Sequence, residues 1–127
     1  MYTLDTNAII YYLNGDKDAV QFLNKILARP VTLYVSAMVE IELFSSKNVS
    51  QIELSNIEAI LETTFNVPID SRVAKLAAKL RRDFNIKIPD SAIAATALLT
   101  NTTLITPLIT RNDKDFRKIP DLKLERI

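Results

Sequence analysis

Acidic residues at four places in the chain could act together in chemistry, because each stands beside an apolar segment or an element end. They are Asp5, Glu42, Asp90 and a last acid at Asp113 or Asp115. Clustered carboxylates repel one another unless a cation neutralises them, and their oxygens suit Mg²⁺ and Mn²⁺. Such a cation activates bound water and stabilises a phosphodiester leaving group. These residue types therefore point to metal-dependent phosphodiester hydrolysis, provided that the fold brings the acids together.

The composition excludes several other kinds of active site. The 127-residue chain has no histidine and no cysteine, which removes imidazole bases, thiol nucleophiles, zinc–thiolate sites and disulfides. Its one glycine, Gly15, cannot form the glycine-rich loops that bind phosphate. The net charge is +1, so any basic surface for nucleic acid must be local.

The length and hydropathy predict one domain over residues 1–127. No segment approaches the ~20 apolar residues of a membrane span, and no secretory signal is visible. We therefore expect a cytoplasmic protein without a membrane anchor.

Strand-like and helix-like segments alternate along the chain, which predicts an α/β fold with a short, mainly parallel sheet flanked by helices. Strands are expected at 2–4, 31–35, 65–69, 103–110 and 122–127. Helices are expected at 6–13, 18–29, 36–46, 50–63, 70–84 and 90–99, with Ser36 and Asp70 as caps. Asp5 ends the first strand, so its carboxylate should lie at the C-terminal edge of the sheet, where ligands bind in such folds.

Each acid also has a purely structural role open to it. Asp5 and Asp90 stand where helices begin, and Asp is a common helix cap. Glu40 competes with Glu42, because the two lie ~200° apart on a helix and both have apolar neighbours. The last two acids lie in a polar stretch that is typical of a solvated loop.

Four segments, in order along nearly the whole chain, resemble the motifs of PIN-domain ribonucleases, and among these the VapC-type toxins of toxin–antitoxin pairs. They are 2–7 (YTLDTN), 36–43 (SAMVEIEL), 88–95 (IPDSAIAA) and 109–116 (ITRNDKDF). In the second motif the acid lies six residues after a serine and precedes a leucine, which favours Glu42 over Glu40. The resemblance implies that Asp5 and Asp90 bind the metal ion, and that Glu42 and Asp115 complete the catalytic cluster.

The resemblance further implies a PIN-like fold, Mg²⁺- or Mn²⁺-dependent hydrolysis of RNA, a cognate antitoxin and a homodimer. Secondary polar candidates near the metal are Thr6, Asn7, Thr110, Asn112 and Asp113. Basic residues around the fourth motif are expected to contact RNA phosphates, and these are Arg111, Lys114, Arg117 and Lys118. One departure from the family pattern precedes this motif, where Leu-Ile-Thr occurs at 104–106 and again at 108–110 and is expected to lengthen the loop.

Two surface features each allow two interpretations. Arg72, Lys75, Lys79 and Arg82 form one stripe along the helix at 70–84, which is typical of a solvated face. Apolar residues in the early helices could belong to the core, or to a dimer interface or antitoxin groove, and these are Ile9, Ile10, Tyr12, Phe22, Leu23, Phe44 and Ile57.

Other functions remain open at this point. A PIN-like module without activity would only bind RNA or a protein, and a metal-dependence assay would distinguish it. An RNA-processing PIN nuclease without an antitoxin would show the same motifs. A phosphatase of the haloacid-dehalogenase type would need a second Asp two residues after the first, where Asn7 stands.

Overall fold

The computed structural model describes residues 1–107 and 111–127, with the side chains of all of these except 111–113. Within these residues a single sheet contains five parallel strands in the order β3-β2-β1-β4-β5. The strands are β1 (Tyr2–Leu4), β2 (Leu33–Ser36), β3 (Phe65–Val67), β4 (Thr103–Thr106) and β5 (Leu124–Arg126). The predicted α/β fold is confirmed. Strand β3 lies at one edge of the sheet and ends before Pro68.

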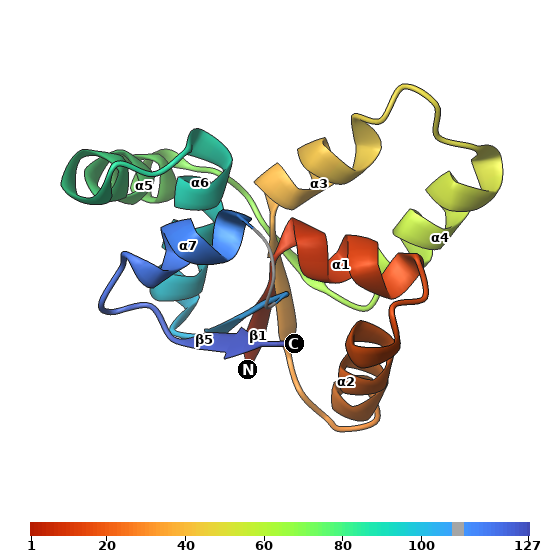
Figure 1. The fold of residues 1–127 in the computed structure, drawn as a ribbon. Coiled ribbons are helices and arrows are strands. Elements are labelled where there is room, and N and C mark those ends of the chain that lie inside the picture. Colours follow the sequence, from red (N-terminus) through yellow and green to blue (C-terminus); the bar gives the residue numbers. More distant parts are fainter. Residues whose placement is uncertain (108–110) are drawn as a thin grey trace.

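Seven helices surround this sheet in the described part of the chain. They are α1 (Thr6–Leu13), α2 (Lys17–Leu27), α3 (Ala37–Phe44), α4 (Gln51–Leu61), α5 (Ser71–Phe84), α6 (Ile88–Thr100) and α7 (Arg111–Arg117). Figure 1 shows α1 and α2 on one side of the sheet, and α5, α6 and α7 on the other. None of these helices is long and apolar enough to cross a membrane.

Side-chain caps explain where several helices begin. Ser36 Oγ accepts from the Met38 N–H at 3.1 Å, and Asp70 Oδ1 accepts from the Val73 N–H at 2.9 Å. Each bond satisfies one of the amide groups that have no partner at a helix N-terminus. Both caps that the sequence predicts are therefore confirmed.

The central position of β1 decides where a ligand can bind. The chain leaves β1 through α1 and α2 and returns as β2 on one edge of the strand, whereas β4 pairs with the other edge. The connections diverge from β1, and in open parallel sheets ligands usually bind beyond the carboxyl ends of the strands at such a point. Asp5 is the residue that follows β1.

The core lies between the sheet and the two helical layers. Alanines at 92, 94, 95 and 97 are buried, and their small side chains let α6 lie close to β1, β2 and β4. The apolar residues of the early helices mostly serve this core, since Ile9, Leu23 and Ile57 are buried. The others (Ile10, Tyr12, Phe22 and Phe44) are partly buried against it.

Some predicted boundaries are wrong, and the prolines explain two of them. The alanine-rich helix begins at Ile88 rather than Asp90, because proline is well tolerated in a first helical turn. Strand β4 ends at Thr106 rather than at residue 110, because Pro107 has no N–H to continue the ladder. The remaining three residues of that predicted strand, and the lengthened loop expected there, lie outside the described residues.

Three further strand boundaries also differ from the prediction. Strand β2 covers Leu33–Ser36 rather than 31–35, β3 stops at Val67, and β5 covers only Leu124–Arg126. The polar stretch that was expected to be a solvated loop forms α7, which Phe116 anchors because its side chain is fully buried.

Candidate functional site

Strand β4 holds Asp5 at the edge of the sheet. Leu4 lies opposite Ile105 in the parallel register, so Asp5 comes next to Thr106. The Asp5 N–H donates to the Ile105 carbonyl at 3.0 Å, and Thr106 Oγ1 donates to Asp5 Oδ2 at 2.9 Å. Asp5 occupies the N-cap position of α1, but its side chain makes no capping hydrogen bond. This carboxylate is fully buried, and it does not serve as a helix cap.

Glu42 reaches the same edge from α3, and Thr6 links it to α1. Thr6 Oγ1 donates to Glu42 Oε1 at 2.7 Å, and the Thr6 side chain is buried. The competing acid, Glu40, instead accepts from the Asn66 side chain on β3. The structure thus distinguishes two glutamates that helical periodicity could not distinguish. It places the carboxylate of Glu42 against Thr6, the residue that follows Asp5.

Asp90 and Asp115 come from the helices on the other side of the sheet. Asp90 lies in the first turn of α6 and is 2% exposed, and Lys87 rather than Asp90 occupies the N-cap position. The capping role considered for Asp90 is therefore wrong. Asp115 lies on α7 with 16% of its side chain exposed, and Lys118 Nζ lies 3.3 Å from its Oδ1.

Burial raises the pKa of Asp5 from its ordinary value of 3.8 to about 7. The negative charge of Glu42 adds to this effect. The hydrogen bond from Thr106 and the amide groups of Thr6 and Asn7 lower the pKa, but they offset burial only in part. Among the side chains that the structure describes, Asp5 makes no ion pair of the kind that a buried carboxylate normally has.

The pKa of Asp90 is also raised to about 7, chiefly by burial. Hydrogen bonding with Asp115 raises it further, as do the negative charges of Asp5, Asp115 and Glu42. Because each of these acids acts on Asp90, the four form one group, which we call the acidic cluster (Asp5, Glu42, Asp90 and Asp115).

The acidic cluster has the donor atoms that a hard divalent cation requires. Asp5 Oδ1 and Asp90 Oδ2 are buried and have no hydrogen-bond partner among the described residues. A cation would give both oxygens a partner and would offset the repulsion between the carboxylates. Among the described residues, no three acidic side chains lie close enough together to hold a metal ion by themselves. Two direct carboxylates with water in the other positions is the arrangement that Mg²⁺ commonly takes.

The other predicted polar residues fall into two groups. Thr6 and Asn7 begin α1 beside Asp5, and Asn7 is half-buried. Thr110 lies outside the described residues, as do the side chains of Arg111, Asn112 and Asp113. The preference for Asp115 over Asp113 or Asn112 as the fourth acid therefore stays a prediction.

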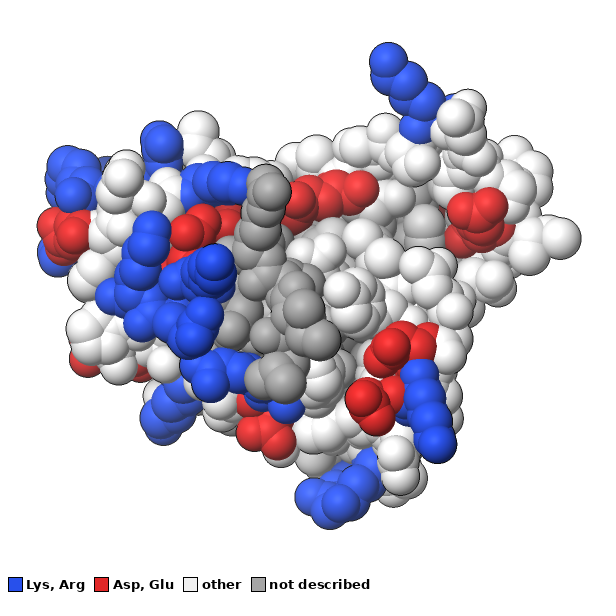
Figure 2. Space-filling model, in the orientation of Figure 1, with Lys and Arg blue, Asp and Glu red and all other residues white. Residues whose placement is uncertain are grey.

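Basic side chains gather on one side of the molecule. Figure 2 shows Lys and Arg over the side that carries α5 and α7, next to Asp and Glu side chains in the upper middle of the view. Lys114 and Arg117 on α7 are exposed. The stripe on α5 is exposed as expected, with Lys79 paired to Asp83 four residues along the helix, which is typical of a solvated face.

Thr106 is a contact of Asp5 that the motif pattern misses. The resemblance points to Thr110, in the second Leu-Ile-Thr, whereas the hydrogen bond to Asp5 comes from the first. Pro107 is the signal that could have found it. Because β4 must end before that proline, Thr106 is the last residue of its strand and lies at the same edge as Asp5.

Comparison with known proteins relates this arrangement to a family and to solved structures. The family model described as PIN domain matches residues 2–122. Among curated proteins, the chain is similar to ribonuclease VapC2 of Rickettsia felis. The identity is 28% over 133 residues, which cover 98% of this chain and 96% of that protein.

Two solved structures share the fold over almost their full length. The structure of VapBC2 from Rickettsia felis bound to a promoter DNA fragment matches with a TM-score of 0.80 and 27% identity, covering 99% of this chain and 98% of that chain. A toxin–antitoxin complex from Klebsiella pneumoniae matches with a TM-score of 0.77 and 30% identity, covering 96% of this chain and 95% of that one.

Proposed function

The chain belongs to the PIN domain family, and from this premise we propose that it is a Mg²⁺- or Mn²⁺-dependent endoribonuclease and the toxin of a toxin–antitoxin pair. The observation that supports the metal-dependent reaction most directly is the acidic cluster, in which Asp5 Oδ1 and Asp90 Oδ2 are buried without a hydrogen-bond partner among the described residues. The likeness to a protein named ribonuclease VapC2 supports RNA as the substrate. The likeness to a toxin–antitoxin complex supports the toxin role.

In this proposal Asp5 and Asp90 bind the cation directly, through the two oxygens that have no hydrogen-bond partner in the described part of the chain. Glu42, oriented by Thr6, and Asp115 complete the site, either directly or through water. The bound cation supplies Lewis acidity, which favours deprotonation of water and offsets the negative charge that develops on the phosphate. Since the chain has no histidine, acid–base catalysis by an imidazole pair has no candidate. The resemblance to PIN-domain ribonucleases implies products with 5′-phosphate and 3′-hydroxyl ends.

Cleavage assays with different metal ions test the proposed function. A panel of transfer, ribosomal and messenger RNA is incubated with the protein and Mg²⁺, Mn²⁺ or EDTA. We expect cleavage with either metal, none with EDTA, and products that a 5′-phosphate-dependent exonuclease degrades. Undiminished cleavage in EDTA would contradict the metal site. RNA binding without cleavage under every condition would instead favour a module that has lost its activity.

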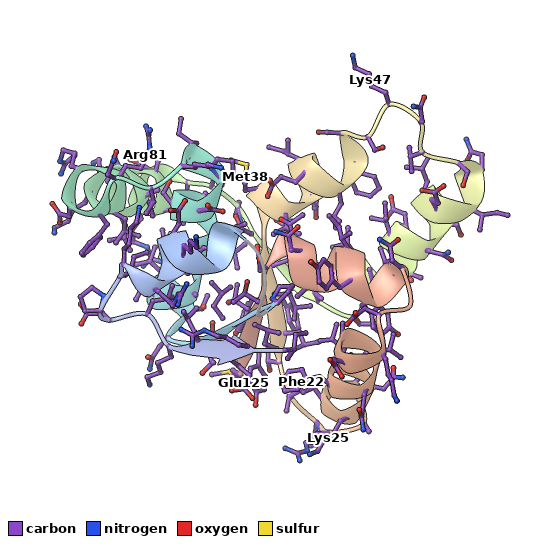
Figure 3. All side chains as sticks on the ribbon, viewed as in Figure 1. Phe22, Lys25, Met38, Lys47, Arg81 and Glu125 are labelled. Atoms are coloured by element: carbon purple, nitrogen blue, oxygen red, sulfur yellow. The ribbon has the colours of Figure 1, made fainter. Side chains whose placement is uncertain are left out.

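Lys114 and Arg117 are the described basic residues on α7 that we propose contact RNA phosphates. Replacing both with alanine should weaken RNA binding in EDTA roughly 10-fold and reduce the salt slope by about 0.7 for each lost phosphate contact. Lys25 and Lys47 provide the matched control, because Lys25 lies on α2 and Lys47 projects from the α3–α4 connection, both away from α7 (Figure 3). A control pair that weakens binding as much would indicate a diffuse charge effect rather than a local surface.

Lys118 was expected to bind RNA as well, but its ammonium group pairs with Asp115. We therefore propose that the main role of Lys118 is to offset part of the negative charge of the acidic cluster. It is left out of the binding variant, because its replacement would change both the RNA surface and the proposed metal site.

A groove between α1, α3 and α4 offers a surface for the antitoxin. It has a volume of about 290 Å³ and is lined by Ile10, Leu13, Leu43, Val49 and Ile57, together with the acidic residues Glu42 and Glu53. Such a surface suits a protein segment with apolar and basic side chains. Because Glu42 belongs to both the groove and the acidic cluster, a segment bound there would lie beside the proposed active site.

We also propose that the protein acts in the cytoplasm, forms a homodimer and consists of one domain. Action in the cytoplasm follows from the proposed RNA substrate. A homodimer and a single domain over residues 1–127 stay predictions from the family resemblance and the chain length. An RNA-processing enzyme without an antitoxin would give the same cleavage results, and co-purification of an antitoxin would distinguish the two.

A further inference from the structure

The structure assigns Thr106 as a positioning residue that holds one oxygen of the Asp5 carboxylate and thereby leaves the other for the metal ion. This inference rests on the proposed function, because it gives Asp5 the role of a metal ligand. It departs from the motif pattern, which points to Thr110 in the second Leu-Ile-Thr.

The backbone around Thr106 holds its side chain in one place. The Asp5 N–H donates to the Ile105 carbonyl on one side, and the Ile127 N–H donates to the Thr106 carbonyl on the other, both at 3.0 Å. Pro107 follows directly and favours extended backbone at Thr106. Since a β-branched side chain also has few χ1 rotamers, the hydroxyl of Thr106 has little freedom to move.

The two oxygens of Asp5 have different environments. Oδ2 accepts from Thr106 Oγ1 at 2.9 Å, whereas Oδ1 is buried with no hydrogen-bond partner among the described residues. A carboxylate rotates easily about its Cβ–Cγ bond, because torsions between sp³ and sp² atoms are broad. The hydrogen bond from Thr106 restricts that rotation and so decides which oxygen remains available.

The side chain of Thr106 acts on Asp5 through a hydrogen bond and carries no charge of its own. Its side chain is fully buried, and its hydroxyl donates a hydrogen bond to Asp5. Partners that orient metal ligands in this way typically change metal affinity or activity 10- to 100-fold when they are removed. We therefore expect the hydroxyl of Thr106 to matter chiefly for metal binding.

Three variants separate this role from a general effect on folding. Thr106→Val removes the hydroxyl and keeps the shape, and Thr106→Ser keeps the hydroxyl. Thr102→Val is the matched control, because Thr102 is also buried, lies just before β4 at its opposite end, and hydrogen-bonds Thr3 rather than an acid. About four residues of extended chain, or roughly 13 Å, separate the two threonines along the strand.

Mn²⁺ affinity is measured by calorimetric titration and by the rise in Tm with Mn²⁺ concentration, next to the Mn²⁺ dependence of RNA cleavage. We expect Thr106→Val to weaken Mn²⁺ binding 10- to 100-fold, and Thr106→Ser to remain within a few-fold of the unchanged protein. Thr102→Val should lower the Tm without metal and leave the Mn²⁺ affinity unchanged.

Two results would overturn the assignment. One is a folded Thr106→Val protein that binds Mn²⁺ as tightly as the unchanged protein, and the other is an equal loss of affinity in Thr102→Val. If Thr106→Val does not fold, failure of Thr106→Ser to retain the affinity would overturn it as well. No Mn²⁺ binding by the unchanged protein would overturn the metal site of the proposed function, and the role of Thr106 with it.

Discussion

Replacing Asp5 or Asp90 with asparagine is expected to lower the rate of RNA cleavage by at least ~10³-fold, because a metal ion contributes several kcal/mol of transition-state stabilisation and about 1.4 kcal/mol is tenfold in rate. Asparagine has nearly the same shape and can still accept the hydrogen bond that Thr106 donates to Asp5. The substitution removes the negative charge that holds the cation. Cleavage with Mg²⁺ and with Mn²⁺, measured next to circular dichroism of each variant, tests this expectation.

Asp121→Asn is the control for these variants, because Asp121 is exposed and lies outside the acidic cluster. It should cleave RNA at the unchanged rate. Full activity in Asp5→Asn or Asp90→Asn would remove that residue from the proposed metal site. An inactive variant must also be shown to be folded. The thermal unfolding measurements described next provide this check, because both variants are expected to be more stable than the original protein when no metal is present.

The metal-free protein is expected to lose stability as the pH rises from about 5 to 8. The folded-state pKa of Asp5 is raised to about 7, so folding favours the protonated form, and the stability present near pH 4 is lost as the pH rises toward 7. For Asp5 alone this amounts to about 2–3 kcal/mol between pH 5 and 8, or on the order of 10 °C in Tm. Asp90 acts in the same direction.

This pH range is unusually informative for this chain. With no histidine and no cysteine, the groups that ordinarily titrate between pH 5 and 8 are missing apart from the amino terminus. Thermal unfolding in EDTA at several pH values should therefore show a falling Tm, and Mn²⁺ at pH 8 should restore it. Asp5→Asn and Asp90→Asn should each flatten the profile, whereas Asp121→Asn should not. A Tm that rises with pH would contradict the pKa shifts of both acids.

Local patterns in the sequence determined much of the fold. Alternating strand-like and helix-like segments predicted the α/β class and the parallel sheet, and cap residues such as Ser36 and Asp70 marked helix starts. The position of Asp5 after the first strand predicted the sheet edge at which it lies. Each of these features depends on neighbours in the chain, so a local pattern was sufficient.

The tertiary structure alone decided how the acids meet and which of them have partners. The motif spacing favoured Glu42 over Glu40, but the different places of the two side chains depend on hydrogen bonds to Thr6 and to Asn66, residues far away in the sequence. The contact between Thr106 and Asp5 crosses 101 residues and depends on the register of two strands. No local pattern carries that register, since it arises when the whole sheet packs against its helices. The sequence by itself supplied the chemical groups, and long-range pairing decided their geometry.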